Sequence, residues 1–243
     1  MNIGKWYGFE KKEFVFNNKN AVVVFPKKSD LKKNWALKTE YWGAFPETEI
    51  ALLERGFHVA YLQNISRFAT DEDCANKEKF ALYLQREFGL RDKCVLIGLS
   101  CGGAHAFNFA GRCPERISCI FVDAPVLNFC SYPGDLASSE CRDIWENEFK
   151  AAYPDMTRAD LVGSDIHPIC KSRTIMKHNI PIILAYGTED RTVIYSENGM
   201  LLEDLCKDYV KLTVLKRNLQ GHHPHGFPTE PSKVADIIIK AII

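Results

Sequence analysis

The chain has 243 residues, of which 46% are hydrophobic, 12% aromatic and 26% charged, a composition typical of a globular protein with a large core. Its 31 lysines and arginines balance 31 aspartates and glutamates, so it lacks the basic excess with which nucleic-acid-binding proteins neutralise phosphates. No stretch approaches the roughly 18 consecutive apolar residues of a membrane span. We therefore expect no nucleic-acid partner, no membrane insertion and one large domain over residues 1–243.

The N-terminus and the cysteines bear on the cellular compartment. The opening segment MNIGKWYGFEKKEFVF lacks the apolar run and the small-residue cleavage site of a signal peptide. The nine cysteines are an odd number and form no CxxC pairs, which indicates reduced and mostly buried thiols. The sequence thus predicts a cytoplasmic protein.

The N-terminal part of the chain predicts a hairpin, a short strand and a helix. Residues 12–16 and 21–25 flank a polar turn and predict an antiparallel hairpin. Residues 34–38 predict a short strand. A helix is expected from Pro46, since proline and acidic residues suit a first turn, to Gly56.

The rest of the chain alternates strands with helices. Residues 57–62 predict a strand, and a capping box of Thr70 and Asp73 predicts a helix that ends at Gly89. A final amphipathic helix begins at Pro231. Further apolar strands are predicted at 94–97, 117–122, 182–186 and 209–215. This alternation predicts an α/β fold with a mainly parallel, doubly wound sheet and an antiparallel N-terminal hairpin.

One segment interrupts the alternation. Residues from about 127 to 178 contain no convincing strand and are rich in serine, aspartate, cysteine and tryptophan, with a helix predicted over residues 140–152. We interpret this segment as a helical, cap-like insertion that covers one end of the sheet.

The strongest functional signal is the G-x-S-x-G pentapeptide centred on Ser100. It follows an apolar strand and precedes a helix, the context in which this motif lifts a serine hydroxyl above a sheet. The turn is so tight that residues two positions either side of the serine must be glycine. The backbone N–H of Cys101, at the start of the helix, is then placed to bind a developing oxyanion.

A serine hydroxyl needs a base and an orienting acid, and both follow in the chain. Asp190 lies in the loop after the strand 182–186, and His222 lies in the loop after the strand 209–215. Serine, aspartate and then histidine is the chain order of the α/β-hydrolases. The sequence therefore predicts a catalytic triad of Ser100, Asp190 and His222.

Several segments carry a family resemblance that extends nearly end to end. The chain resembles a bacterial esterase-like branch of the α/β-hydrolase superfamily, and the resemblance implies the same three triad residues. The segments that carry it are Trp35–Phe45 (WALKTEYWGAF), Gly98–Gly103 (GLSCGG), Asp123–Val126 (DAPV), Gly187–Asn198 and Gly221–His225 (GHHPH).

This chain departs from the superfamily where the oxyanion hole is built. Most members carry His-Gly after the third strand, whereas this chain has Lys38, Thr39 and Glu40. We expect a backbone N–H of this segment, Thr39 first and Glu40 second, to join that of Cys101. The side chains of Lys38, Glu40, Tyr41 and Trp42 are expected to line the substrate pocket.

Other interpretations of the same residues remain. His223 is the alternative base, and the His222, His223 and His225 cluster is typical of a metal site as well. Because no carboxylate or CxxC partner has ligand spacing, we expect no metal and no organic cofactor. Cys101 is one position away from where a thiol nucleophile would stand, and Asp123 is expected to serve a structural role.

The leading hypothesis is a serine hydrolase that cleaves carboxylic esters, with small neutral esters and acylated sugars or plant polysaccharides as substrates by analogy. One alternative is a peptidase of the prolyl-oligopeptidase kind, although this chain carries no large separate propeller domain. The other alternative is a hydrolase-fold protein that binds a small ligand without turnover. The oligomeric state is left open.

Overall fold

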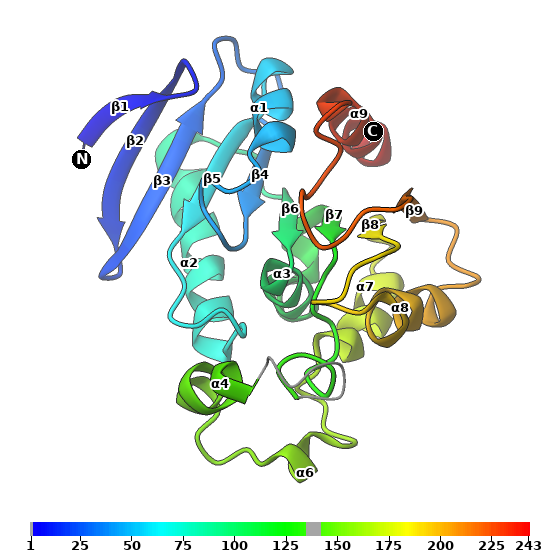
Figure 1. Ribbon diagram of the computed structural model, residues 1–243. Helices are drawn as coiled ribbons and strands as arrows, with labels where there is room; N and C mark the ends of the chain where they lie inside the picture. The colour runs from blue at the N-terminus through cyan, green and yellow to red at the C-terminus, as the bar shows by residue number, and fades with distance from the viewer. Residues whose placement is uncertain (1, 135–141) are drawn as a thin grey trace.

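The computed structural model describes residues 2–134 and 142–243. A nine-stranded sheet runs through it in the order β1-β2-β3-β5-β4-β6-β7-β8-β9 (Figure 1). The pairs β1–β2, β2–β3 and β3–β5 are antiparallel, and all later pairs are parallel. The strands are β1 (Asn2–Trp6), β2 (Phe9–Phe16), β3 (Lys19–Phe25), β4 (Trp35–Lys38), β5 (His58–Leu62), β6 (Cys94–Leu99), β7 (Ile117–Asp123), β8 (Ile182–Gly187) and β9 (Leu212–Arg217). The predicted mainly parallel sheet with its N-terminal hairpin is confirmed.

Three strands differ from the prediction by three residues or more. β2 begins at Phe9 rather than at residue 12. β1 extends the sheet by one antiparallel edge strand that the sequence analysis missed, because its side chains are mostly exposed and show no apolar alternation. β9 begins at Leu212, three residues later than predicted. Tyr209 instead lies in the preceding turn and donates its hydroxyl to the carbonyl of Ile180 at 2.8 Å.

Helices cover both faces of the sheet. The helices α1 and α9 pack on one face, where Leu52, Val234 and Ile238 are buried against the central strands. The opposite face is covered by α2, α3, α7 and α8, which bury Phe80, Phe107 and other apolar side chains there. The bounds of these helices are α1 (Glu47–Glu54), α2 (Asp71–Phe88), α3 (Cys101–Arg112), α7 (Ser172–Lys177), α8 (Gly199–Leu205) and α9 (Pro231–Ile242). No helix in these described residues is both long and apolar enough to cross a membrane.

The ends of α2 follow directly from its sequence. The Thr70 side chain accepts from the Asp73 N–H while the Asp73 carboxylate accepts from the Thr70 N–H, which confirms the predicted capping box. Gly89 ends the helix in the left-handed conformation, with φ of 64°.

The segment between β7 and β8 leaves the sheet. Its described part contains no strand, and α4 and α6 lie at the bottom of Figure 1, away from the sheet. Residues 135–141, which include the start of the predicted helix, lie outside the described residues. The segment comprises α4 (Arg142–Ile144), a π-helix (Trp145–Phe149), α5 (Lys150–Ala152), α6 (Arg158–Leu161), a 3₁₀ turn (Pro168–Lys171) and α7.

We call residues 142–166 the cap segment. Its apolar side chains, among them Trp145 and Phe149, are buried against Phe68 from the loop before α2 and against Ala104 at the start of α3. In contrast, Ile175 of α7 belongs to the main core under the sheet. The last part of the predicted insertion therefore covers the sheet as an ordinary helix of the fold.

Candidate active site

Three loops at the carboxyl edge of the parallel strands bring Ser100, Asp190 and His222 together. Nε2 of His222 lies 3.1 Å from the Ser100 hydroxyl oxygen, and its Nδ1 lies 2.8 Å from the Asp190 carboxylate. These three side chains come from the ends of β6, β8 and β9, which are neighbours or near neighbours in the sheet. Parallel strands deliver their carboxyl ends to one edge, so the sequence order becomes a spatial cluster.

Ser100 stands on a strained turn between β6 and α3. Its backbone has φ of 53° and ψ of −121°, a conformation that is uncommon for any residue but glycine. The turn is held by two backbone hydrogen bonds. The Ser100 N–H donates to the backbone carbonyl of Asp123 at 3.0 Å, and the Ser100 carbonyl accepts from the Val126 N–H at 3.0 Å. A Cβ at Gly98 would lie 2.5 Å from the Gly102 carbonyl oxygen, so only glycine permits this close approach.

Asp190 is buried and ionised. One carboxylate oxygen accepts from the N–H groups of Thr192 and Val193, each at 2.9 Å, and the other faces His222. Burial acts to raise the Asp190 pKa, but the hydrogen bond and charge of His222 and the two N–H groups hold that pKa below its usual value. The carboxylate is thus available to orient the imidazole and to stabilise its charged form.

A buried ion pair anchors the loop that carries His222. The Arg217 guanidinium donates to the Asp123 carboxylate at 2.6 Å and also to the Pro224 carbonyl, and the Gly226 N–H donates to the other oxygen of Asp123. Asp123 therefore holds the histidine loop in place rather than contacting His222. Sequence reasoning expected a structural role for Asp123 but missed Arg217, which ends a strand whose side chains are largely exposed.

The structure corrects the prediction for the second oxyanion donor. The Thr39 N–H donates to the Ile97 carbonyl at 3.0 Å as part of the β4–β6 pairing, so it is not available to a ligand. The Tyr41 N–H donates to the Glu40 carboxylate at 3.2 Å. Within the described chain, the N–H groups of Glu40 and Cys101 have no hydrogen-bond partner, and the Glu40 nitrogen lies 3.6 Å from where a Cβ on Gly102 would stand.

A buried polar network holds the segment that contains Glu40. Asn64 donates to the Glu40 carboxylate and, at 2.7 Å, to the Thr39 carbonyl, while its own oxygen accepts from Lys77. Lys77 is fully buried and also lies 3.0 Å from Nδ1 of His105. Burial and the Lys77 charge keep the His105 pKa well below its usual value, so this imidazole is neutral. No sequence pattern signalled this network.

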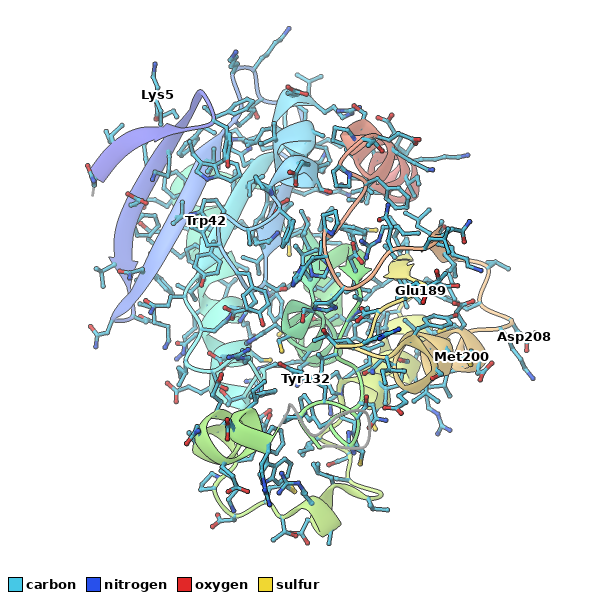
Figure 2. The ribbon with its side chains drawn as sticks, viewed as in Figure 1. Lys5, Trp42, Tyr132, Glu189, Met200 and Asp208 are labelled. Atoms are coloured by element: carbon cyan, nitrogen blue, oxygen red, sulfur yellow. The ribbon has the colours of Figure 1, made fainter. Side chains whose placement is uncertain are left out.

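The cleft above Ser100 has a volume of about 310 Å³. Of the four side chains predicted to line the pocket, Tyr41 does so. Its wall also contains Phe45, Arg67 and Tyr132, which sequence reasoning did not assign to the pocket; Tyr132, labelled in Figure 2, lies between the sheet and the cap segment. The full lining is Tyr41, Ala44, Phe45, Arg67, Leu99, Ser100, Tyr132, Thr192, His222, His223 and His225.

The other three predicted side chains, those of Lys38, Glu40 and Trp42, do not line this cleft. Lys38 is buried in an ion pair with Glu49 and donates to the Ala44 carbonyl at 3.1 Å. Trp42 lies over the N-terminal strands (Figure 2), stacked on Trp6 with ring centroids 4.9 Å apart. The Glu40 carboxylate accepts from Asn64 in the polar network described above. In each case a strong local partner draws the side chain away from the cleft.

An ion pair joins the cap segment to the wall of this cleft. Nε and Nη2 of Arg67 donate to the two carboxylate oxygens of Glu148, each at 2.5 Å. The pairing is bidentate, which fixes both planes, although both side chains are about one-third exposed. The cap segment therefore contributes to the position of a cleft side chain without lining the cleft at this point.

The other candidate residues are Cys101, which follows the nucleophile, and the histidines next to His222. Cys101 is buried, and burial raises the pKa of its thiol to about 11, which makes it a poor nucleophile. His223 is exposed, and its ring stacks on Phe45 with centroids 5.2 Å apart. It makes no hydrogen bond to Ser100 or Asp190, so the triad geometry falls to His222. Among the described residues, the three histidines of this loop form a group that could hold a metal ion.

The sequence matches no protein-family model and no curated protein, whereas many solved structures share its fold. The esterase Pf2001 from Pyrococcus furiosus has a TM-score of 0.69 at 15% identity, covering 98% of this chain and 97% of that one. A fluorophosphonate-binding serine hydrolase, FphF from Staphylococcus aureus, has a TM-score of 0.70 at 13% identity, covering 97% and 98%. A putative dipeptidyl aminopeptidase IV from Bacteroides ovatus has a TM-score of 0.69 at 11% identity; 96% of this chain is covered, but the chain spans only 35% of that protein. The nine-stranded sheet and these likenesses together establish the α/β-hydrolase fold.

Proposed function

We propose that this protein is a serine hydrolase that cleaves small carboxylic esters through an acyl-enzyme. His222 takes the proton from the Ser100 hydroxyl, and the oxygen attacks the ester carbonyl. The alcohol leaves with a proton from the same imidazole, and water then attacks the acyl group with His222 again as the base. Asp190 holds the imidazole tautomer and stabilises its charged form. The single observation that carries this proposal is the continuous hydrogen-bonded chain from Ser100 through His222 to Asp190.

The oxyanion would be bound by the backbone N–H groups of Cys101 and Glu40. Both N–H groups lack a partner among the described residues, whereas that of Thr39 is engaged in the sheet. Donors that are held in place before the reaction cost no reorganisation when charge develops, and removing one such donor typically slows an enzyme by about 10²–10³. The buried network behind Glu40 fits this demand for fixed geometry.

The cleft favours a small ester with an apolar acyl or alcohol group. Its volume of about 310 Å³ lies at the lower end of the roughly 300–1,000 Å³ of ligand pockets. Tyr41, Phe45 and Tyr132 supply aromatic surface on its walls. We therefore expect short acyl chains to be cleaved faster than long ones, and short-acyl sugars are included because the alcohol side can extend from the open cleft.

A fluorophosphonate probe tests the nucleophile directly. The probe phosphonylates an activated serine, and the modified peptide is identified by mass spectrometry. We expect labelling at Ser100 in the native protein and none in Ser100→Ala. His222→Gln should abolish labelling, whereas His223→Gln should retain it, which separates the two candidate bases. An unlabelled but correctly folded native protein would favour the alternative of a hydrolase-fold ligand-binding protein.

A substrate series separates the ester and peptide alternatives. p-Nitrophenyl esters of increasing acyl length, acetylated xylo-oligosaccharides and aminoacyl p-nitroanilides are assayed side by side. We expect turnover of acetate and butyrate esters, weaker turnover of long acyl esters and no turnover of the anilides. Asp190→Asn should lower kcat by about 10⁴ because the imidazole loses its tautomer. Preferential cleavage of the anilides would replace the esterase proposal with a peptidase.

A further inference from the structure

The loop after β9 brings three imidazoles into the lining of the cleft. The ring centroids of His222, His223 and His225 lie 4.7, 4.8 and 4.9 Å from one another. One nitrogen of each ring lies within 4.8 Å of a nitrogen of the other two. In the proposed ester hydrolysis only His222 has a chemical role, so the other two rings are unexplained by it.

His222 is oriented as metal-binding imidazoles are, and His225 lies near a carboxylate in a similar way. Nδ1 of His222 lies 2.8 Å from the Asp190 carboxylate, whereas Nδ1 of His225 lies 3.6 Å from the Asp123 carboxylate and is buried without a hydrogen bond. A metal-ligating histidine almost always has its second ring nitrogen on a carboxylate, carbonyl or water, which fixes the tautomer and leaves the other nitrogen free to bind. Nε2 of His222 and Nε2 of His225 are the nitrogens that this arrangement leaves.

The third ring makes the group accessible and adaptable. His223 is exposed and stacks on Phe45 in the cleft wall, so an ion can reach it from solvent. Zinc–imidazole bonds of about 2.0–2.1 Å in a tetrahedron place ligand nitrogens about 3.3 Å apart. The widest separation of 4.8 Å must therefore close by about 1.5 Å, and His223 is the side chain that is free to move.

We propose that this cleft binds one zinc ion through Nε2 of His222, Nε2 of His225 and a ring nitrogen of His223, and that the bound ion inhibits the hydrolase. Imidazole ligands suit zinc rather than magnesium or calcium. The lone pair of His222 Nε2 that would take the Ser100 proton is the same lone pair that would bind the metal. Zinc and catalysis therefore exclude one another. The binding is independent of the proposed function, and only the inhibition rests on it.

A binding experiment tests the site apart from the activity. Chelator-treated Ser100→Ala protein, which cannot turn over substrate, is titrated with zinc chloride by calorimetry. We expect one zinc per chain, no heat with magnesium, and an affinity lower by about tenfold or more in a further His223→Ala variant, since even loss of a partner behind a ligand costs 10–100-fold. His178→Ala, which changes an exposed histidine directly after α7, is the matched control and should bind as tightly as its parent. Absent binding, or equal binding by the His223→Ala variant, overturns the site.

A rate measurement then tests the inhibition. Ester hydrolysis by the native protein should fall with added zinc and return fully with EDTA, and His223→Ala should need about tenfold more zinc relative to its own metal-free rate. If EDTA instead abolishes hydrolysis, the ion is catalytic and the proposal is wrong. If zinc binds but no ester is cleaved, the proposed function fails while the zinc site stands.

Discussion

Replacing Arg217 with methionine should weaken both the fold and the catalytic loop. The Arg217 side chain is 1% exposed and that of its partner Asp123 is 0% exposed. Methionine keeps much of the volume but removes the donors to Asp123 and to Pro224. The buried carboxylate then keeps the Gly226 N–H as its one remaining hydrogen bond in the described residues, with His225 at 3.6 Å. Breaking a buried pair in this way typically costs about 3–5 kcal/mol.

The cost is measurable in two ways. For a chain of this size, it corresponds to a Tm lower by about 6–20 °C, and urea unfolding gives the free energy directly. Loss of the anchor should also shift His222, and a misplacement of about 1 Å lowers kcat by about 10²-fold. The control is Arg55→Met, which breaks the exposed pair with Asp236, whose side chains are 25% and 63% exposed, and should cost no more than about 1 kcal/mol. Equal costs for the two variants would refute the anchoring role of the buried pair.

Three further predictions concern the turn that carries Ser100, the Cys101 thiol next to it and the triad acid Asp190. Gly98→Ala places a Cβ 2.5 Å from the Gly102 carbonyl oxygen in the first turn of α3. It should destabilise the fold by about 1–3 kcal/mol and lower kcat. The control is Gly4→Ala, whose new Cβ would have its nearest atom at 3.8 Å, and it should change neither the stability nor kcat. Iodoacetamide at pH 8 should leave Cys101 unmodified in the folded protein because burial raises its thiol pKa to about 11, while exposed Cys170 reacts; rapid alkylation of Cys101 would contradict its burial. Because the Asp190 pKa is held below its usual 3.8, its ionised form stabilises the fold above that pH, and this stabilisation is lost as pH falls through the lower folded pKa. Urea unfolding should therefore show that Asp190→Asn costs stability at pH 7 and costs less at pH 3; an equal cost at both values would be inconsistent with the lowered pKa.

Much of the fold is predictable from the sequence because its central strands are buried. β6 and β8 consist of apolar runs between glycine and polar turns, and α2 carries its own start and stop signals in Thr70 and Gly89. Such local signals agree with the final packing. β1 is the exception, since an exposed edge strand gains its pairing from β2 and not from a buried face.

The candidate site is predictable where chemistry forces a residue type into a strained backbone, and not where contacts are long-range. Ser100 is found because its turn needs glycines at fixed positions. Thr39 was predicted as an oxyanion donor from its position in the chain after the strand 34–38. In the structure its N–H continues the β4–β6 pairing and donates to the Ile97 carbonyl instead. The pairing of Arg217 with Asp123 joins residues 94 positions apart, which no local pattern reveals.

The buried ion pairs of this protein lie near Ser100, and this position indicates what they do. Lys38 with Glu49 and Arg217 with Asp123 are buried ion pairs, and each holds a segment that lines the cleft beside Ser100. Buried ion pairs are weak sources of stability, since apolar side chains of the same volume stabilise a core equally well or better. What a charged pair adds is direction, because its hydrogen bonds fix the angle as well as the distance between two segments. The formal net charge of the chain is zero, yet charged side chains are buried in its interior. They lie where the backbone near Ser100 has to keep a fixed position. On this reasoning, the polar interior supports the geometry of the proposed reaction more than it supports the fold.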